Sequence, residues 1–264
     1  MKHHLSNTIF VALSLVAVAH TASASTPTAS LTPTSAAIHN IVLVHGLYAD
    51  GSSWEKVIPL LQAKGLHVTS VQNPTTSLND DVDAVKRALA EQDGPTLLVA
   101  HSYGGMVISQ AGDDPKVSGL VYIAARAPDA GEDYPALSRK FPAAPASAGL
   151  QWSKDGYGKL SEHAFVNDFA GDLPKAEAEK YFAVQQPIGK LITTAKTTVA
   201  AWHNKPTWYA VSTEDHTIDP EFQRFMAKRM NAHTIEIASS HVSLLSHPQA
   251  VANLILEAAG VEKK

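Results

Sequence analysis

The sequence contains no cysteine among its 264 residues. This absence excludes disulfide bonds, a thiolate nucleophile and cysteine-ligated metals, so any chemistry must come from oxygen and nitrogen side chains. Metal-binding spacings such as H-E-x-x-H are also missing from the sequence. We therefore expect an activity that uses neither a metal nor another cofactor.

Charge is sparse as well, because charged residues make up 17% of the chain and the formal net charge is -4. Such a chain has no basic field to attract nucleic acid or an anionic membrane surface, and we expect neither as a partner. Hydrophobic residues make up 45%, which is enough for one sizeable core. The composition predicts one main soluble domain and leaves its oligomeric state open.

The first 24 residues have the pattern of a secretory signal peptide. Lys2 gives a weakly positive start, the apolar run 9–19 is too short to span a bilayer comfortably, and Ala22 and Ala24 offer small residues for cleavage. Residues 25–37 are rich in Ser, Thr, Pro and Ala, which is typical of a disordered linker. We therefore expect a periplasmic or secreted protein without a stable membrane anchor.

From residue 38 onward, short apolar runs rich in β-branched residues alternate with longer helical patterns. Strands that alternate with helices predict a mainly parallel sheet flanked by helices, so the fold class of 38–264 is α/β. The helical stripes lie at 78–89, 222–230 and 251–259. The expected strands are 41–44, 68–71, 96–100, 119–124, 207–211 and 234–237.

One interval, 127–202, interrupts this alternation. It is rich in proline, alanine and aromatic residues, with short helical pieces and no convincing strand. An insertion between two parallel strands is expected to cover the carboxyl edge of the sheet, where open α/β sheets bind ligands. We call 127–202 the lid, and we expect some of its aromatic side chains to line a pocket.

The segment "LLVAHSYGGMVIS" combines a buried strand with a serine and two glycines. A strand that turns into a helix within so few residues places Ser102 in a strained, exposed position, which is the geometry of the G-x-S-x-G nucleophile elbow. Ala100 stands where that motif has its first glycine, and Gly104 matches the second. We predict that Ser102 is a nucleophile rather than a helix cap.

A serine nucleophile requires a histidine base and a carboxylate, which in this arrangement follow later in the chain, each after a strand. His241 comes directly after the last expected strand and is the predicted base. His247 lies beyond that loop, where Ser246 and Gln249 have the spacing of a capping box. We expect His101 to be a surface group or to support the site rather than to act as its base.

The loop after the preceding strand offers three acids. Asp215 is freer and close to the strand end and is the predicted acid, with Glu214 and Asp219 as alternatives. Asp219 precedes Pro220, a pattern that predicts a helix N-cap whose oxygen is already occupied. His216 in the same loop is expected to be a surface or supporting group.

Acyl transfer also needs hydrogen-bond donors for the developing oxyanion. The N–H of Tyr103, which follows the nucleophile, is one expected donor. The loop after the first strand supplies the other, because Gly46 allows close approach and leaves the N–H of Leu47 free to donate. The same loop also has the pattern of a strand-to-helix turn, with Ser52 and Glu55 spaced as a capping box.

Four segments resemble the α/β-hydrolase superfamily: the elbow, "LVHGLYADGSSW", "TEDHTIDPEFQRFMAKRM" and "SSHVSLLSHP". They are most similar to the plant methylesterase and hydroxynitrile-lyase group and its bacterial esterase relatives, over about 38–260. Position by position, the resemblance implies Ser102, Asp215 and His241 as a triad. It also implies Leu47 and Tyr103 as oxyanion donors.

The predicted function is hydrolysis of a small carboxylic ester through an acyl-enzyme. The lyases of the resembled group carry a lysine after the base histidine, whereas this chain has Val242, which favours ester hydrolysis. Hydroxynitrile-lyase-like or perhydrolase activity on the same scaffold is one alternative. A ligand-binding receptor built on a hydrolase scaffold is another. The identity of the ester, including its acyl and alcohol halves, stays open.

Overall fold

The computed structural model describes residues 38–261 together with Met1. The signal peptide predicted for 1–24 and the linker predicted for 25–37 therefore lie, apart from Met1, outside the described residues. Within the described part of the chain, no helix is both long and apolar enough to cross a membrane.

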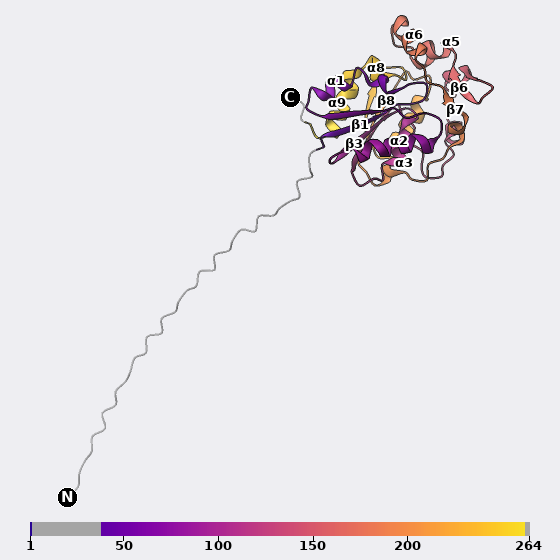
Figure 1. Ribbon diagram of the computed structural model, residues 1–264. Helices are drawn as coiled ribbons and strands as arrows, with labels where there is room; N and C mark the ends of the chain where they lie inside the picture. The colour runs from indigo at the N-terminus through magenta and orange to yellow at the C-terminus, as the bar shows by residue number, and fades with distance from the viewer. Residues whose placement is uncertain (2–37, 262–264) are drawn as a thin grey trace. The chain divides into compact units, whose positions relative to one another are not determined.

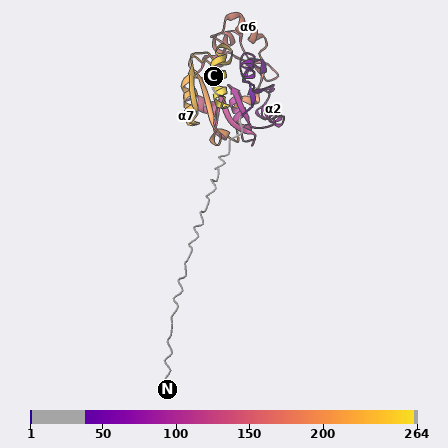
Figure 2. The ribbon, with the colours of Figure 1, turned by 90° about the vertical axis from the view of Figure 1, so that its left-hand side faces the viewer.

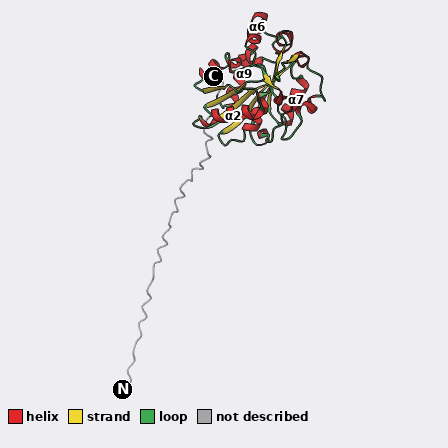
Figure 3. Ribbon diagram, turned by 45° about the vertical axis from the view of Figure 1, so that its right-hand side comes forward, coloured by secondary structure: helices red, strands yellow, loops and turns green. Residues whose placement is uncertain are grey.

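The centre of the domain is a six-stranded sheet with the strand order β2-β1-β3-β4-β8-β9. Every neighbouring pair in it is parallel. All six expected strands are present with small shifts at their ends, so the prediction of a mainly parallel sheet is confirmed (Figure 3). The strands are β1 (Asn40–Val44), β2 (His67–Val71), β3 (Thr96–His101), β4 (Val117–Ile123), β8 (Thr207–Ser212) and β9 (His233–Ile237).

Successive strands are added on one side of β1 at first and on its other side afterwards. The chain passes from β1 outward to β2 and then returns to place β3 on the other side of β1. Helical connections after β1 and β3 consequently leave on opposite faces, which opens a crevice at the carboxyl ends of these two strands. Val44 and Ala100 are paired at these ends, so the loops that follow β1 and β3 start side by side.

Helices cover both faces of the sheet (Figure 1). The sequence explains where they begin: Ser77 caps α2 by accepting a hydrogen bond from the N–H of Asp80, and Asp219 caps α7 in front of Pro220. Figure 2 shows α7 and α2 toward opposite ends of the sheet, with α7 beside β8 and α2 beside β1 and β2. The helices are α1 (Ile58–Gln62), α2 (Leu78–Ala90), α3 (Gly104–Ala111), α7 (Pro220–Arg229), α8 (Ser243–Ser246) and α9 (Pro248–Ala258).

The hydrophobic core lies on both faces of the central strands. Every residue of β1 and β3 is buried, as expected for parallel strands that are covered on both sides. On α2 the apolar stripe of Val82, Val85 and Leu89 is buried against the sheet. The periodicity in the sequence thus predicted which face of α2 enters the core.

The lid lies between β4 and β8, and α6 projects from the sheet in Figures 1 and 2. The expectation that it contains no strand is wrong, because β5, β6 and β7 form a three-stranded antiparallel sheet. These strands have at most four residues, too few for an apolar alternation to be visible. The lid elements are α4 (Tyr134–Ser138), β5 (Leu150–Trp152), β6 (Tyr157–Leu160), α5 (Glu162–Ala164), α6 (Lys175–Ala183) and β7 (Ile188–Gly189).

Both expected capping boxes are also wrong. After β1, a short 3₁₀ turn (Gly51–Trp54) is capped by Asp50, which accepts from the N–H of Ser52, while Glu55 pairs with Lys180 of the lid. At the start of α9 no side chain caps the helix, and the hydroxyl of Ser246 instead contacts the ring of His247. In both places a neighbouring polar group competes successfully for the side chain that the motif would use.

Candidate active site

The turn between β3 and α3 holds Ser102 in a left-handed backbone conformation with φ of 55°. Non-glycine residues seldom adopt this region, so the turn is strained as the elbow motif predicts. A side chain at Gly46 would place its Cβ 2.6 Å from that of Ser102, and one at Gly104 would lie 2.8 Å from the carbonyl oxygen of His45. The small residues are needed because the loop after β1 packs directly on the elbow.

Ser102 is 4% exposed, so the expectation of an exposed nucleophile is wrong. The lid supplies the cover through a π-helical turn, Phe165–Phe169. The ring of Phe169 lies 5.1 Å from the ring of His241 and 6.2 Å from that of Tyr48, measured between centroids. A site closed by aromatic rings keeps bulk water away from the serine, which strengthens electrostatic interactions inside it.

The structure brings Ser102, His241 and Asp215 together from three separate loops. Nε2 of His241 lies 2.8 Å from Oγ of Ser102, and Nδ1 lies 2.6 Å from Oδ2 of Asp215. A carboxylate can only accept, so Nδ1 of His241 carries the proton and Nε2 is free to accept the proton of the serine hydroxyl. Both side chains of the His241 and Asp215 pair are fully buried, so water does not compete for these contacts.

Asp215 is held by several donors besides His241. Its Oδ1 accepts from the N–H groups of Thr217 and Ile218 at 2.6 and 3.0 Å. Its Oδ2 also accepts from Nε2 of Gln223 at 2.7 Å. These bonds fix the orientation of the carboxylate and stabilise its charged form in a buried site.

Gln223 is a residue that the sequence reasoning missed. It is fully buried on α7, where its amide donates to Asp215 and to the carbonyl of Ile218 and accepts from the N–H of Ser212. The only sequence signal is a polar residue on the apolar face of a helix that follows the acid. That signal is shared by many residues without any link to a site.

The rival acids and bases lie in other surroundings. Asp219 uses its Oδ1 to cap α7, as expected from Pro220 behind it, and Glu214 is exposed. His216 is also exposed and lies 3.5 Å from Asp168 of the lid. His247 contacts Ser246 at the start of α9, so none of these four side chains joins the hydrogen-bonded line that includes Ser102.

His101 supports the base from the position before the nucleophile. It is buried, its Nε2 donates to the carbonyl oxygen of His241 at 2.8 Å, and the two rings lie 4.6 Å apart. Burial, reinforced by the neighbouring His241, holds the pKa of His101 well below its ordinary value, so this ring stays neutral. Burial likewise lowers the pKa of His45 at the end of β1.

Leu47 and Tyr103 both lie in buried loops at the carboxyl edge of the sheet, beside the elbow. Among the described residues, the N–H of neither residue donates to a protein acceptor. A buried N–H without a protein partner is costly, so both are available for an oxygen of a bound ligand. The arrangement fits the predicted oxyanion donors.

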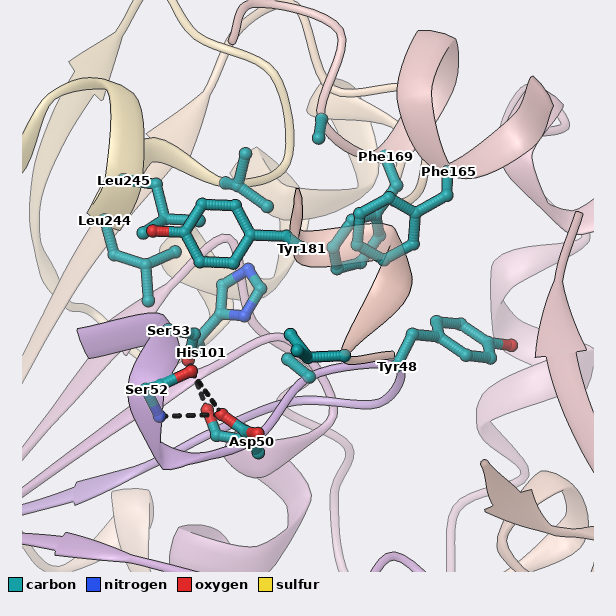
Figure 4. Close-up of a pocket in the computed structure, with 14 residues that line it drawn as sticks. Tyr48, Asp50, Ser52, Ser53, His101, Phe165, Phe169, Tyr181, Leu244 and Leu245 are labelled. Atoms are coloured by element: carbon teal, nitrogen blue, oxygen red, sulfur yellow. Dashed lines mark hydrogen bonds between the residues drawn. The ribbon is translucent and has the colours of Figure 1, made fainter. Parts of the chain in front are cut away.

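Two cavities meet at Tyr48. The first is narrow, with a volume of about 20 Å³, is mostly apolar and is lined by His101, Phe169 and Tyr181, among others (Figure 4). Figure 4 shows Phe165, Phe169 and Tyr181 of the lid across from Leu244 and Leu245. The second cavity, of about 430 Å³, extends from Leu47 toward the lid. Across 38–261, no group of three or more His, Asp or Glu side chains is placed to hold a metal ion.

With this fold and site in view, comparison with known proteins identifies the class. A model of the alpha/beta hydrolase family matches residues 41–254, and the chain belongs to this family. It is 27% identical to Methylesterase 8 of Arabidopsis thaliana, with 83% of this chain and 89% of that protein covered. It is 26% identical to Salicylic acid-binding protein 2 of Nicotiana tabacum, with 83% and 96% covered.

Solved structures agree on the fold. A pyrethroid hydrolase from Sphingobium faniae JZ-2 superposes with a TM-score of 0.69 at 23% identity, covering 84% of this chain and 98% of the other. Polyneuridine aldehyde esterase superposes with a TM-score of 0.72 at 21% identity, covering 84% and 99%. The predicted α/β-hydrolase fold and the resemblance to plant methylesterases are therefore confirmed.

Proposed function

We propose that this protein hydrolyses small carboxylic esters through an acyl-enzyme formed on Ser102. The observation that carries the proposal is the continuous line of hydrogen bonds from Ser102 through His241 to Asp215. Family membership and relatives named methylesterases and esterases support ester hydrolysis as the reaction type.

In the proposed reaction, Nε2 of His241 accepts the hydroxyl proton of Ser102 while Oγ attacks the ester carbonyl carbon. The carbonyl oxygen becomes an oxyanion and accepts hydrogen bonds from the N–H groups of Leu47 and Tyr103. His241 then passes its proton to the departing alcohol, and an acyl ester on Ser102 remains. A water molecule, activated by the same histidine, releases the acid and restores the serine.

Asp215 acts through His241 in this scheme. Its carboxylate fixes the imidazole tautomer that can accept at Nε2 and stabilises the imidazolium that forms after proton transfer. Asp215 can stabilise the imidazolium in this way because Thr217, Ile218 and Gln223 already hold its carboxylate in the required orientation. No reorganisation is then needed during the reaction.

The test is hydrolysis of p-nitrophenyl esters of increasing acyl length and of methyl esters of aromatic acids, in the presence of EDTA. We expect cleavage that weakens with long acyl chains, because the lid closes the site. Ser102→Ala should lower kcat by about a million-fold, as loss of the nucleophile does in serine hydrolases, and should stay folded. More than a few per cent of activity in purified Ser102→Ala would refute the proposal.

Mandelonitrile in the same panel separates the alternatives. Cyanide release would indicate a lyase, although Val242 stands where a lyase of the resembled group has lysine. Tight ligand binding without turnover of any ester would indicate a receptor. Ester cleavage that depends on Ser102, without cyanide release, supports the esterase.

We also propose that residues 1–24 direct export to the periplasm or the medium. The support is the sequence pattern of a weakly positive start, an apolar run and small residues before residue 25. Fractionation of expressing cells, followed by N-terminal sequencing, tests this. A mature protein that begins at Met1 in the cytoplasm would contradict it.

A further inference from the structure

A second charged group lies close to the elbow, and the proposed mechanism does not use it. Arg126 follows β4, and its backbone N–H donates to the carbonyl oxygen of Ser102 at 2.9 Å. Its side chain is half-buried and lines the 430 Å³ cavity together with Leu47 and Tyr48. The guanidinium therefore borders the same cavity as one predicted oxyanion donor.

The guanidinium of Arg126 has no carboxylate partner within the described residues. Its Nε is buried and makes no hydrogen bond, and its contacts are the faces of Tyr134 at 4.9 Å and Tyr103 at 5.8 Å. Arg229, the other arginine with ring contacts among the described residues, pairs instead with Glu132 at 2.9 Å. A charge withdrawn from water without a counter-charge is costly unless a ligand supplies one.

The groups around Arg126 do not neutralise it. Burial raises the pKa of Tyr48 to about 12 and raises those of Tyr103 and Tyr134 further, so these phenols stay neutral. Asp219, a carboxylate that also lines the cavity, directs its Oδ1 to the N–H groups at the start of α7 and forms no ion pair with Arg126. A second cation, Arg139, lines the cavity as well.

We propose, on the basis of the proposed esterase function, that Arg126 binds a carboxylate on the substrate and that the enzyme prefers esters bearing a carboxylate in one half. The planar guanidinium matches a carboxylate in geometry, and a charge-assisted hydrogen bond in a half-buried cavity is stronger than one in water. The cavity that Arg126 lines has a volume of about 430 Å³, which is enough for a small ester together with its carboxylate.

Two matched pairs of substrates test this inference. Mono(4-nitrophenyl) glutarate and 4-nitrophenyl pentanoate differ by a carboxylate in the acyl half. 4-Acetoxybenzoate and 4-methylphenyl acetate differ by a carboxylate in the alcohol half. For each pair, the ratio of kcat/KM for the anionic ester to that for the neutral ester is compared between wild type and variants, so that intrinsic reactivity cancels.

We expect Arg126→Met to lower this ratio by about tenfold to a hundredfold in one pair, which is the range for loss of a hydrogen bond to a charged group. Arg126→Lys should restore part of the ratio because it keeps the charge but not the planar fork. Arg87→Met is the control, because Arg87 is exposed on α2 and does not line the cavity. An unchanged ratio in both pairs, or the same fall in Arg87→Met, would overturn the inference.

A binding measurement separates this inference from the esterase proposal. Glutarate is titrated calorimetrically into Ser102→Ala and into Ser102→Ala with Arg126→Met. Weaker binding after loss of Arg126 supports the anion site even if no ester in the panel is cleaved. Equal binding would reject the anion site even if ester hydrolysis is established.

Discussion

At the scale of single residues, Asp215 and Asp219 make different hydrogen bonds although they lie in the same loop. Asp215 is buried and bonded to His241, whereas Asp219 bonds the first N–H groups of α7. Both would be plausible acids if only the order of residues were known. Their surroundings therefore allow a matched pair of substitutions.

We expect Asp215→Asn to lower kcat by about ten-thousand-fold, because an amide favours the wrong tautomer of the base histidine. Asp219→Asn should change kcat little, since asparagine also caps helices well. Steady-state kinetics on a p-nitrophenyl ester, with circular dichroism to verify folding, measure both. If Asp219→Asn were the damaging change, the assignment of the acid would be reversed.

At the scale of secondary-structure elements, Gln223 joins β8, the loop after it and α7. Its single side chain bonds Ser212 at the end of the strand, Ile218 in the loop and the carboxylate of Asp215. All these partners are buried, so water cannot replace the amide when it is removed. The position of the acid thus depends on the docking of α7.

Gln223→Met should lower the free energy of unfolding by about 2–4 kcal/mol, because it leaves several buried groups without partners. It should also reduce kcat, though less than Asp215→Asn does, since the two backbone donors to Asp215 remain. Urea denaturation and ester kinetics provide the two measurements.

Gln110→Met is the matched control. Gln110 also bonds a neighbouring segment, at Thr198 and Val199, but its bonds lie nearer the solvent and away from the site. We expect a loss of about 1 kcal/mol or less and unchanged kcat. If both glutamine variants had the same effect on kcat, the link from α7 to the acid would be disproved.

The elements that the sequence predicted are those with strong local signals. Strands such as β1 and β3 are long, apolar and followed by turn residues, so their existence and parallel arrangement could be inferred. The strands of the lid could not, because β7 has two residues and is defined only by its pairing with β6. Pairing between segments distant in sequence leaves no local pattern.

The residues of the candidate site also fall into two groups, those that local sequence patterns predict and those that depend on tertiary packing. Ser102, Asp215 and His241 follow predicted strands, and parallel strands bring their carboxyl ends to one edge. Gln223 and Phe169 reach the site through the docking of α7 and of the lid, which depends on tertiary packing. The burial of Ser102 was mispredicted for the same reason, since the cover comes from a lid turn more than 60 residues away in sequence.

At the scale of the whole molecule, buried ionisable groups make stability depend on pH. Asp81 on α2 is fully buried, where it accepts from the N–H of Thr75 and from the hydroxyl of Tyr103. Burial raises the pKa of Asp81 to about 6, and the two hydrogen bonds only partly oppose this effect. The group connects α2 to the residue that carries one of the predicted oxyanion donors.

The sign of the Asp81 contribution follows from linkage. Between about pH 4 and pH 6 the native protein keeps a proton that the unfolded chain has released, so this group makes the native state less stable as pH rises. His45 and His101 act in the opposite direction, because their lowered pKa values mean that stability is lost as pH falls below about 6.5. The pH dependence of the free energy of unfolding therefore contains opposing contributions. The contribution of Asp81 is isolated only by comparing a variant at this position with the wild type.

We expect the free energy of unfolding of Asp81→Asn, relative to wild type, to rise by about 3 kcal/mol between pH 4 and pH 6.5. The rise occurs because asparagine removes the titration of Asp81 but leaves the histidine contributions equal in both proteins. Urea unfolding at several pH values measures the difference, and Asp83→Asn on the exposed face of α2 should run parallel to wild type. A constant difference between Asp81→Asn and wild type across this range would show that Asp81 is ionised in the native protein throughout it, and that its hydrogen bonds outweigh its burial.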